Sequence, residues 1–208
     1  MKIFLFDIGN VICDFDFDQL LKKYEEISGK PVGIHSLSDQ EMYNSVETGE
    51  ISDQEYVDKV NQAKSINWKV EDLIYAWENI FSENIFGRAL FNHSISNHTP
   101  TYMLSNIADY HVQAINRTWP NYIDQASGFF MSYKMGVRKP DPKIYTQVIN
   151  ELGVSPENCF FIDDLEENTF AARKQGINAH QFIPDNYENI FKKANSFFKW
   201  EKVCEFPA

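Results

Sequence analysis

Carboxylate side chains follow two short apolar runs in this sequence. Asp7 comes directly after residues 2–6, and Asp163 and Asp164 come directly after residues 159–162. A single aspartate in such a place is most often a turn former or a helix cap. Two adjacent carboxylates, however, repel each other unless a cation or hydrogen-bond donors offset their charge. The acidic pair therefore predicts a cation-binding position.

Three other polar side chains complete a set that could handle phosphate. Ser105 and Asn106 follow a third apolar run, and Lys139 precedes a helix start at Asp141-Pro142. Taken alone, the Ser-Asn pair is typical of a turn or helix cap, and the lysine of a solvated surface. Together with the carboxylates they supply what phosphoryl transfer requires: a carboxylate nucleophile, polar and cationic groups for the phosphoryl oxygens, and ligands for Mg²⁺.

The elements that must position these groups are short buried strands. The apolar runs predict five strands, at residues 2–6, 101–104, 128–131, 159–162 and 179–183. A helix from Asp141 to a stop at Gly153 lies between two of them, and another is expected over residues 166–175. Alternating strands and helices indicate an α/β fold with a doubly wound parallel sheet. In such sheets ligands bind at the carboxyl ends of the strands, where the polar groups lie.

Residues 15–88 have a different character, because they contain several amphipathic helical segments and no evident strand. Ser52-Asp53-Gln54-Glu55 has the form of a capping box. We therefore expect residues 15–88 to form an all-helical cap domain, inserted into an α/β core domain of residues 1–14 and 89–208. The four tryptophans are interpreted as packing residues. An insert that leaves after the first strand would cover the ligand crevice.

Composition restricts the classes of partner. The chain has 208 residues and a formal net charge of −11, which repels nucleic acid and anionic membrane surfaces. No apolar run approaches the roughly 18 residues that would span a bilayer. Three dispersed cysteines without a C-x-x-C motif favour a reducing, cytoplasmic location. The sequence leaves the oligomeric state open.

The polar segments together resemble the motifs of the haloacid dehalogenase (HAD) superfamily. The resemblance implies a Rossmann-like core, a small helical cap and Mg²⁺ as cofactor. Thr48-Gly49-Glu50-Ile51-Ser52 resembles a segment common in such caps. The motifs that carry the resemblance are Phe6-Asp7-Ile8-Gly9-Asn10-Val11, Leu104-Ser105-Asn106, Gly136-Val137-Arg138-Lys139-Pro140-Asp141, and Phe161-Ile162-Asp163-Asp164 with Asn168.

This resemblance also implies a role for each matched residue. Asp7 would be the nucleophile and a metal ligand, with the backbone carbonyl of Gly9 as another ligand. Lys139 would hold the phosphoryl group and steady Asp7. The remaining implied roles are phosphoryl binding for Ser105 and Asn106, and metal binding for Asp164 with Asp163 beside it. Which of the two adjacent aspartates contacts the metal stays open at this point.

Gly9 departs from the pattern of most phosphatases of the superfamily, which place a second aspartate there as general acid and base. Loss of a general acid typically slows a reaction by ~10²–10⁴-fold. Activity could be lost; another group could substitute, such as Asp14, Asp16, a cap residue or water; or the leaving group could need little protonation. The third possibility has a parallel in an Asp-x-Gly-Asn-Val subgroup, which this chain resembles and which includes bacterial α-D-glucose-1-phosphate phosphatases.

We therefore predict a Mg²⁺-dependent phosphatase that acts on small phosphorylated metabolites through an aspartyl-phosphate on Asp7. Sugar phosphates are the expected class, and sugar 1-phosphates are favoured because an anomeric hydroxyl leaves more easily than an ordinary alcohol. The missing acid argues against phosphomutase activity. The alternatives are a metal-independent haloacid dehalogenase and a degenerate, non-catalytic binding protein.

Overall fold

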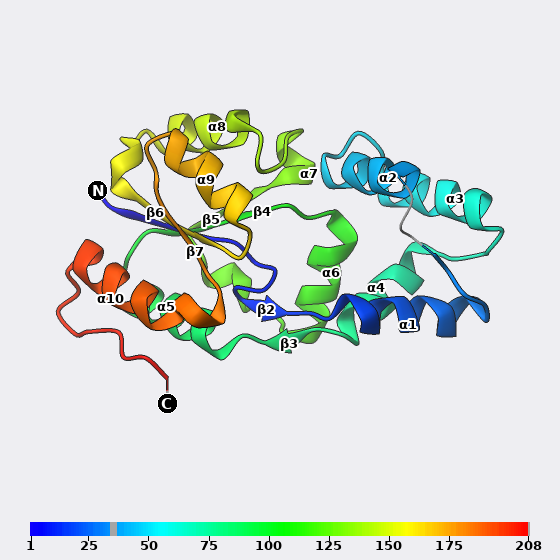
Figure 1. Ribbon diagram of the computed structural model, residues 1–208, viewed down its shortest axis with the longest axis horizontal. Helices are drawn as coiled ribbons and strands as arrows, with labels where there is room; N and C mark the ends of the chain where they lie inside the picture. Colours follow the sequence, from blue (N-terminus) through cyan, green and yellow to red (C-terminus); the bar gives the residue numbers. More distant parts are fainter. Residues whose placement is uncertain (34–36, 208) are drawn as a thin grey trace.

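The computed structural model describes residues 1–33 and 37–207, and its centre is a five-stranded sheet (Figure 1). All neighbouring strands are parallel, in the order β5-β4-β1-β6-β7. The predicted α/β fold with a parallel sheet is thus confirmed, and each strand lies within two residues of its expected position. The strands are β1 (Ile3–Phe6), β4 (Thr101–Ser105), β5 (Gly128–Met131), β6 (Cys159–Asp163) and β7 (Asn178–Gln181).

Side chains of β1 alternate between two hydrophobic cores, as the two-residue period of a strand requires. Phe4 and Phe6 lie in one core with residues of α5 (Ile85–Ser96) and α10 (Tyr187–Phe198). Ile3 and Leu5 lie in the other, with residues of α8 (Pro142–Leu152) and α9 (Glu166–Lys174). Both faces of the sheet are therefore covered by helices, which explains why the central strand β1 is apolar throughout.

The helix that follows Lys139 begins and ends as the sequence predicts. The Asp141 side chain accepts a hydrogen bond from the backbone of Lys143, and Gly153 ends α8 in the left-handed conformation at φ 62°. Two further helices, α6 (Asp109–Thr118) and α7 (Ser132–Met135), follow β4 and β5. Short 3₁₀ turns occupy Ile123–Gln125, Pro156–Asn158 and Pro184–Asn186.

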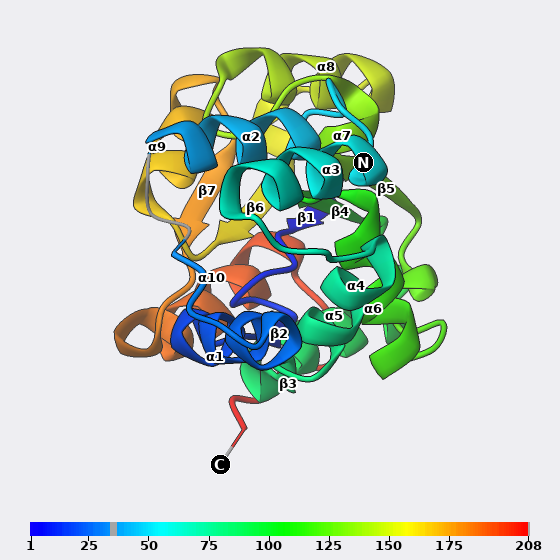
Figure 2. The same ribbon diagram turned by 90° about the vertical axis from the view of Figure 1, so that its right-hand side faces the viewer.

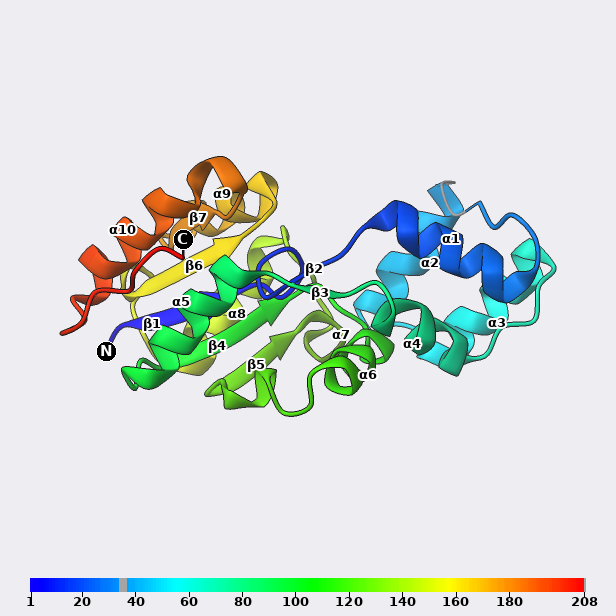
Figure 3. The ribbon, with the colours of Figure 1, turned by 90° about the horizontal axis from the view of Figure 1, so that it is seen from below.

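Four helices form a separate group beyond the carboxyl ends of the strands (Figures 1 and 3). They are α1 (Phe17–Ser28), α2 (Leu37–Glu47), α3 (Asp53–Lys64) and α4 (Val70–Glu78). The expected capping box is present, because Ser52 and Glu55 each accept a hydrogen bond from the other's backbone N–H. We call residues 15–81 the helical segment.

The helical segment has its own hydrophobic core, which also takes in one face of α6. Leu20, Val57 and Trp77 are buried there together with Tyr110 and Ala114. Helix α4 packs on α6, and α2 contacts α7. The view in Figure 2 looks along the molecule from this end, with α1 to α4 in front of the sheet. The segment therefore rests on the core through α6 and α7.

The chain enters and leaves the helical segment through a two-stranded antiparallel ladder, β2 (Cys13–Asp14) with β3 (Ser82–Glu83). The expectation that residues 15–88 contain no strand is wrong at this point. Two polar residues carry no detectable alternation, so tertiary pairing alone defines the strand. Arg88 fastens the ladder, because its Nε donates to the Ile12 carbonyl at 3.1 Å and its Nη1 lies 2.8 Å from Glu83.

No helix within the described residues combines the length and the apolar character that crossing a bilayer demands.

Candidate active site

A cavity of about 180 Å³ lies between the carboxyl ends of the strands and the helical segment. One side of its wall comes from the loops after β1, β4 and β6. The other side comes from α2, α4 and the residues that flank them. Six residues singled out from the sequence line it: Asp7, Gly9, Ser105, Asn106, Lys139 and Asp164.

Asp7 is held at the end of β1 by the sheet itself, because its backbone N–H donates to the Ile162 carbonyl at 3.0 Å. The residue is only 7% exposed, and Oδ1 accepts from the Ile8 N–H at 2.8 Å. Burial raises the pKa of the Asp7 carboxyl to about 7, against the opposing effect of Lys139 and a hydrogen bond with Ser105. A nearby cation would lower this pKa and keep the nucleophile ionised.

Lys139 is a buried cation that joins two of the carboxylates. Its Nζ lies 3.0 Å from Asp7 Oδ1, and it donates to Asp163 Oδ2 at 2.5 Å and to the Leu104 carbonyl at 2.9 Å. Burial alone lowers the pKa of a lysine, but Asp163 and Asp7 outweigh it and hold the pKa of Lys139 above its ordinary value. The ammonium therefore stays charged at the base of the cavity.

Asn106 fixes the backbone of Lys139 from both sides. Its Nδ2 donates to the Lys139 carbonyl at 2.8 Å, and its Oδ1 accepts from the Lys139 N–H at 2.7 Å. A side-chain amide has two N–H donors, so one is left for a bound group. Ser105, which is buried at the end of β4, presents its hydroxyl beside Asp7.

The two adjacent aspartates occupy different environments. Asp163 is fully buried, and its oxygens accept hydrogen bonds from Lys139, the Leu165 N–H and Asn168 Nδ2. Asp164 is partly exposed, lines the cavity and accepts one hydrogen bond from Asn10 Nδ2 at 2.9 Å. Asp164 thus has free acceptor capacity toward the cavity, whereas Asp163 is occupied by protein donors.

The carboxylates meet the requirement of a hard cation. Asp7, Asp163 and Asp164 each offer an oxygen within 4.8 Å of the others. Lys139 supplies one positive charge to the three groups, and burial raises the pKa of both Asp7 and Asp164. Carboxylate oxygens are the ligands that Mg²⁺ prefers. The donor set therefore fits a divalent cation placed between Asp7 and Asp164.

The space beside Gly9 is occupied by an aromatic ring. A Cβ atom added to Gly9 would stand 3.0 Å from Cε1 of Phe15. Phe15 lines the cavity and packs edge-on against Trp77, with ring centroids 5.2 Å apart. A side chain at this position would crowd the Phe15 ring, which would have to shift by a few tenths of an ångström.

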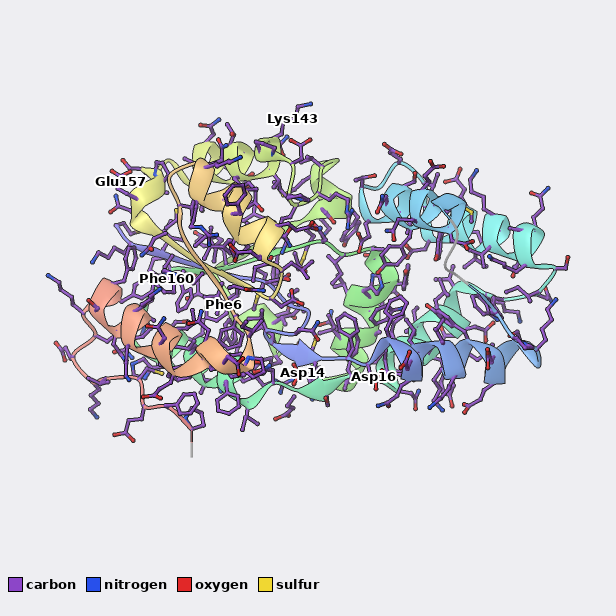
Figure 4. The ribbon with its side chains drawn as sticks, viewed as in Figure 1. Phe6, Asp14, Asp16, Lys143, Glu157 and Phe160 are labelled. Atoms are coloured by element: carbon purple, nitrogen blue, oxygen red, sulfur yellow. The ribbon has the colours of Figure 1, made fainter. Side chains whose placement is uncertain are left out.

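Asp14 and Asp16, the nearby carboxylates considered as substitutes, do not line the cavity. Asp14 accepts from Asn84 Nδ2 at 2.8 Å within the β2–β3 ladder. Asp16 caps helix α1 by accepting from the Asp18 N–H at 2.8 Å, and the cap lowers the pKa of Asp16. Figure 4 shows both residues along the connection into α1.

Several residues of the cavity wall escaped the sequence motifs. Trp77, which is 4% exposed, both packs in the helical segment and lines the cavity, so its interpretation as a packing residue was incomplete. Others among them are Tyr43 and Glu47 on α2 and His111 on α6; Arg138 also lines the cavity, and it stands in the motif of Lys139 without an assigned role. Only the cap-like sequence that begins one residue after Glu47 could have directed attention to them.

These residues form a polar chain across the cavity wall. The Ala108 N–H donates to His111 Nδ1 at 3.0 Å, and Nε2 of the same ring lies 3.4 Å from the Tyr43 hydroxyl. Burial lowers the pKa of His111 to about 3, so its imidazole stays neutral. Tyr43 also interacts with the Glu47 carboxyl, whose Oε2 lies 2.9 Å from Arg138 Nη2. The chain runs from the core to the helical segment and back to the residue next to Lys139.

Comparison with known proteins shows similarity over most of the chain. D-ribitol-5-phosphate phosphatase of Bacteroides thetaiotaomicron is 21% identical over 196 residues, which covers 89% of this chain and 93% of the relative. Flavin mononucleotide hydrolase 1 of Arabidopsis thaliana is 33% identical over 93 residues, covering 40% of this chain and 37% of the relative.

Solved structures share the fold. A HAD family enzyme from B. thetaiotaomicron, crystallised with magnesium and inorganic phosphate, superposes with a TM-score of 0.77 at 22% identity and covers 92% of this chain and 99% of its own. A HAD-like hydrolase from Porphyromonas gingivalis gives 0.77 at 18% identity, covering 97% and 99%. A model of the family described as haloacid dehalogenase-like hydrolase matches residues 1–176, and the chain therefore belongs to that family.

Proposed function

We propose that this chain hydrolyses small phosphomonoesters, with Asp7 as the nucleophile. The prediction that it is an enzyme of the phosphoric monoester hydrolase class is confirmed at the level of its family and relatives. The observation that carries the proposed mechanism is the position of Asp7: a buried carboxylate at a strand end, 3.0 Å from a buried ammonium and open to a cavity.

In the proposed mechanism, Asp7 attacks phosphorus and forms an aspartyl-phosphate, which water then hydrolyses. Ser105 and the free N–H of Asn106 hold phosphoryl oxygens. Lys139 offsets the charge that gathers on these oxygens and keeps the Asp7 carboxylate in line. Asp163 takes no direct part; through its bond to Lys139 it fixes the ammonium in place.

Mg²⁺ would be held by Asp7 and Asp164, with the Gly9 carbonyl as the ligand implied by family resemblance. Bound there, it would neutralise the repulsion between the nucleophile and the phosphate dianion. The different hydrogen bonding of the two adjacent aspartates supports Asp164 as the direct metal ligand, because Asp163 already accepts three hydrogen bonds.

We also infer that residues 15–88 act as a cap domain over a core of residues 1–14 and 89–208. The separate hydrophobic core of the helical segment and its share of the cavity wall support this division. A cytoplasmic location and the exclusion of nucleic acid and membrane partners stay predictions from the sequence.

Phosphorylated sugars or sugar alcohols are the proposed substrate class, in keeping with the ribitol-phosphate relative. The subgroup assignment and the preference for sugar 1-phosphates also stay predictions. A panel of sugar 1-phosphates, sugar 6-phosphates, alditol phosphates, nucleotides and acyl phosphates tests them, with Asp7→Asn as control. Faster hydrolysis of 6-phosphates than of 1-phosphates would refute the preference, and activity in Asp7→Asn would refute the mechanism.

Two alternatives are separated by simple assays. Removal of divalent cations with EDTA should abolish phosphatase turnover, whereas a metal-independent dehalogenase would continue to release halide. A non-catalytic binding protein would turn over no member of the panel with Mg²⁺ present. The cluster of Asp7, Asp163 and Asp164 favours the metal-dependent reaction over both.

A further inference from the structure

We propose that Glu47, on helix α2 of the helical segment, is the proton donor and acceptor that replaces the side chain missing at Gly9. The inference rests on the phosphatase function proposed above. It addresses a different step of the reaction, namely how the leaving group receives its proton and how water loses one.

The first support is the state of the Glu47 carboxyl. The residue is 3% exposed and lines the same cavity as Asp7. Its Oε2 lies 2.9 Å from Arg138 Nη2, and the carboxyl also interacts with the Tyr43 hydroxyl, but Oε2 has no well-directed hydrogen bond among the described residues. A buried carboxyl oxygen without a hydrogen bond is costly and rare in folded proteins. The cavity is the place from which a substrate could supply the missing partner.

The second support is its position relative to the nucleophile. In phosphoryl transfer the attacking and leaving oxygens lie roughly in line on opposite sides of phosphorus. Asp7 attacks from the strand ends, so the leaving oxygen must point away from the sheet. Helix α2, which carries Glu47, forms part of the opposite wall.

The third support is that the other titratable groups of the cavity are unsuited to the task. Lys139 is committed to two carboxylates, and Asp164 belongs to the proposed cation site. His111 stays neutral because burial holds its pKa near 3. Burial also raises the pKa of Cys13 and Tyr43 far above neutrality.

The surroundings of Glu47 act on its carboxyl in both directions. Burial raises its pKa above the ordinary value, while Arg138 and Tyr43 oppose this shift. A raised pKa is the shift that a glutamate needs in order to act as a general acid. Arg138 also fixes the carboxyl by joining it to the loop that carries Lys139.

The proposed proton transfers balance over one catalytic cycle. As the Asp7 oxygen bonds to phosphorus, the bond between phosphorus and the leaving oxygen breaks. Its electron pair stays on that oxygen, which takes the proton of Glu47. In the second step the Glu47 carboxylate takes a proton from the water that attacks phosphorus. Asp7 is released as a carboxylate, inorganic phosphate departs, and Glu47 is protonated again.

The test compares Glu47→Gln with wild type on three substrates whose leaving groups differ: ribitol 5-phosphate, α-D-glucose 1-phosphate and p-nitrophenyl phosphate. Glutamine keeps the size of the side chain but cannot transfer the proton. We expect kcat/KM to fall by ~10²-fold or more for ribitol 5-phosphate, and by less than about fivefold for p-nitrophenyl phosphate, whose leaving group departs unprotonated. Glucose 1-phosphate should fall between them.

A second readout follows the other half of the cycle. With p-nitrophenyl phosphate, Glu47→Gln should form the aspartyl-phosphate but hydrolyse it slowly. The phosphorylated protein should therefore accumulate after acid quench, detected by intact-protein mass, and nitrophenol should appear in a burst. Glu50→Gln, an exposed neighbour in the same segment, should behave as wild type.

An equal loss on all three substrates, without phosphoenzyme, would show that Glu47 only holds the helical segment in place and would overturn the inference. An unchanged rate on ribitol 5-phosphate would overturn it as well. In either case the proposed function stands if wild type is active and Asp7→Asn is not. If wild type hydrolyses no substrate, both proposals fall together.

Discussion

The two walls of the cavity are built in different ways. On the core side, the side chains of Asp163 and Lys139 have no unused bonding capacity among the described residues, and each is 1% exposed or less. On the side of the helical segment, Glu47 contacts Arg138 and Tyr43, and its buried Oε2 lacks a well-directed hydrogen bond. The buried pair at the base of the core wall is thus fully engaged, whereas the opposite wall retains a buried acceptor oxygen.

This difference separates the groups that hold the reacting phosphoryl group from those that face the leaving group. A network whose members satisfy one another is rigid and holds charges in place for the reacting phosphoryl group. A wall with open polar groups between aromatic rings contacts the rest of the substrate and can vary with it. The following predictions test how far the two walls are independent.

The largest effect is expected at the nucleophile on the core wall. Asp7→Asn keeps the size of the side chain but removes its nucleophilic oxygen, so turnover should fall by at least ~10⁴-fold. Release of inorganic phosphate at saturating substrate measures this. Binding of the product phosphate should persist, and its loss would indicate that the wall had collapsed.

Removal of the buried ammonium group of Lys139 should destabilise the core wall as a whole. Lys139→Met leaves Asp7 and Asp163 facing each other without their shared partner, which should lower the free energy of unfolding by ~3–5 kcal/mol. Urea unfolding measures the change. Lys143→Met, at the exposed start of α8 (Figure 4), is the matched control and should stay within about 0.5 kcal/mol of wild type.

A substitution at the contact between the helical segment and α7 should lower the free energy of unfolding by a moderate amount. Gly49 has φ +70°, and a Cβ there would stand 2.2 Å from the Tyr133 carbonyl oxygen in α7. Gly49→Ala should therefore cost ~1–3 kcal/mol through steric overlap, beyond its backbone strain. Gly29→Ala controls for strain alone, because its φ is +67° and nothing lies within 4 Å. Equal destabilisation by the two changes would contradict a tight contact.

The smallest expected effect is a pH dependence of the free energy of unfolding that arises from Asp53. Burial, and then Asp109, raise the pKa of Asp53 to about 6. A raised pKa means that the folded state disfavours the charged form, so this residue costs stability as pH rises from about 4 to 6. Asp53→Asn should raise the free energy of unfolding at pH 7 by ~1 kcal/mol or less, because the site is partly exposed.

The gain from Asp53→Asn should shrink as pH is lowered to 4.5, where the wild-type carboxyl becomes protonated. Thermal unfolding at the two pH values measures it. Asp58→Asn, an exposed change on the same helix, controls for net charge. A gain that did not vary with pH would contradict the assignment.

The sequence was sufficient to predict the α/β fold and much of the core wall. Apolar runs that end in Asp7, Ser105 and Asp163 carry a local signal, because each strand must be buried and each polar group must follow it. The helix cap at Asp141 and the stop at Gly153 are similarly local. Features that depend on constraints within about ten residues, such as strand ends and helix caps, could therefore be predicted from the sequence.

The wall formed by the helical segment could not be predicted from the sequence, because no local signal marks its residues. Glu47, Tyr43 and Trp77 face the cavity only because helices α2 and α4 pack on α6 and α7. The close approach of Phe15 to position 9 likewise depends on how the chain returns after β2. Such placements arise from tertiary packing, which no spacing in the sequence reveals.

The ladder of β2 and β3 has a consequence for how such proteins diversify. Cys13 pairs with Glu83 and Asp14 with Ser82, so the two ends of the intervening 67 residues lie side by side. A segment of any length whose ends meet at that spacing could be exchanged there without altering the sheet. The ladder would thus allow the substrate range and the proton donor to change together, while Asp7, Lys139 and the other groups at the strand ends stay the same.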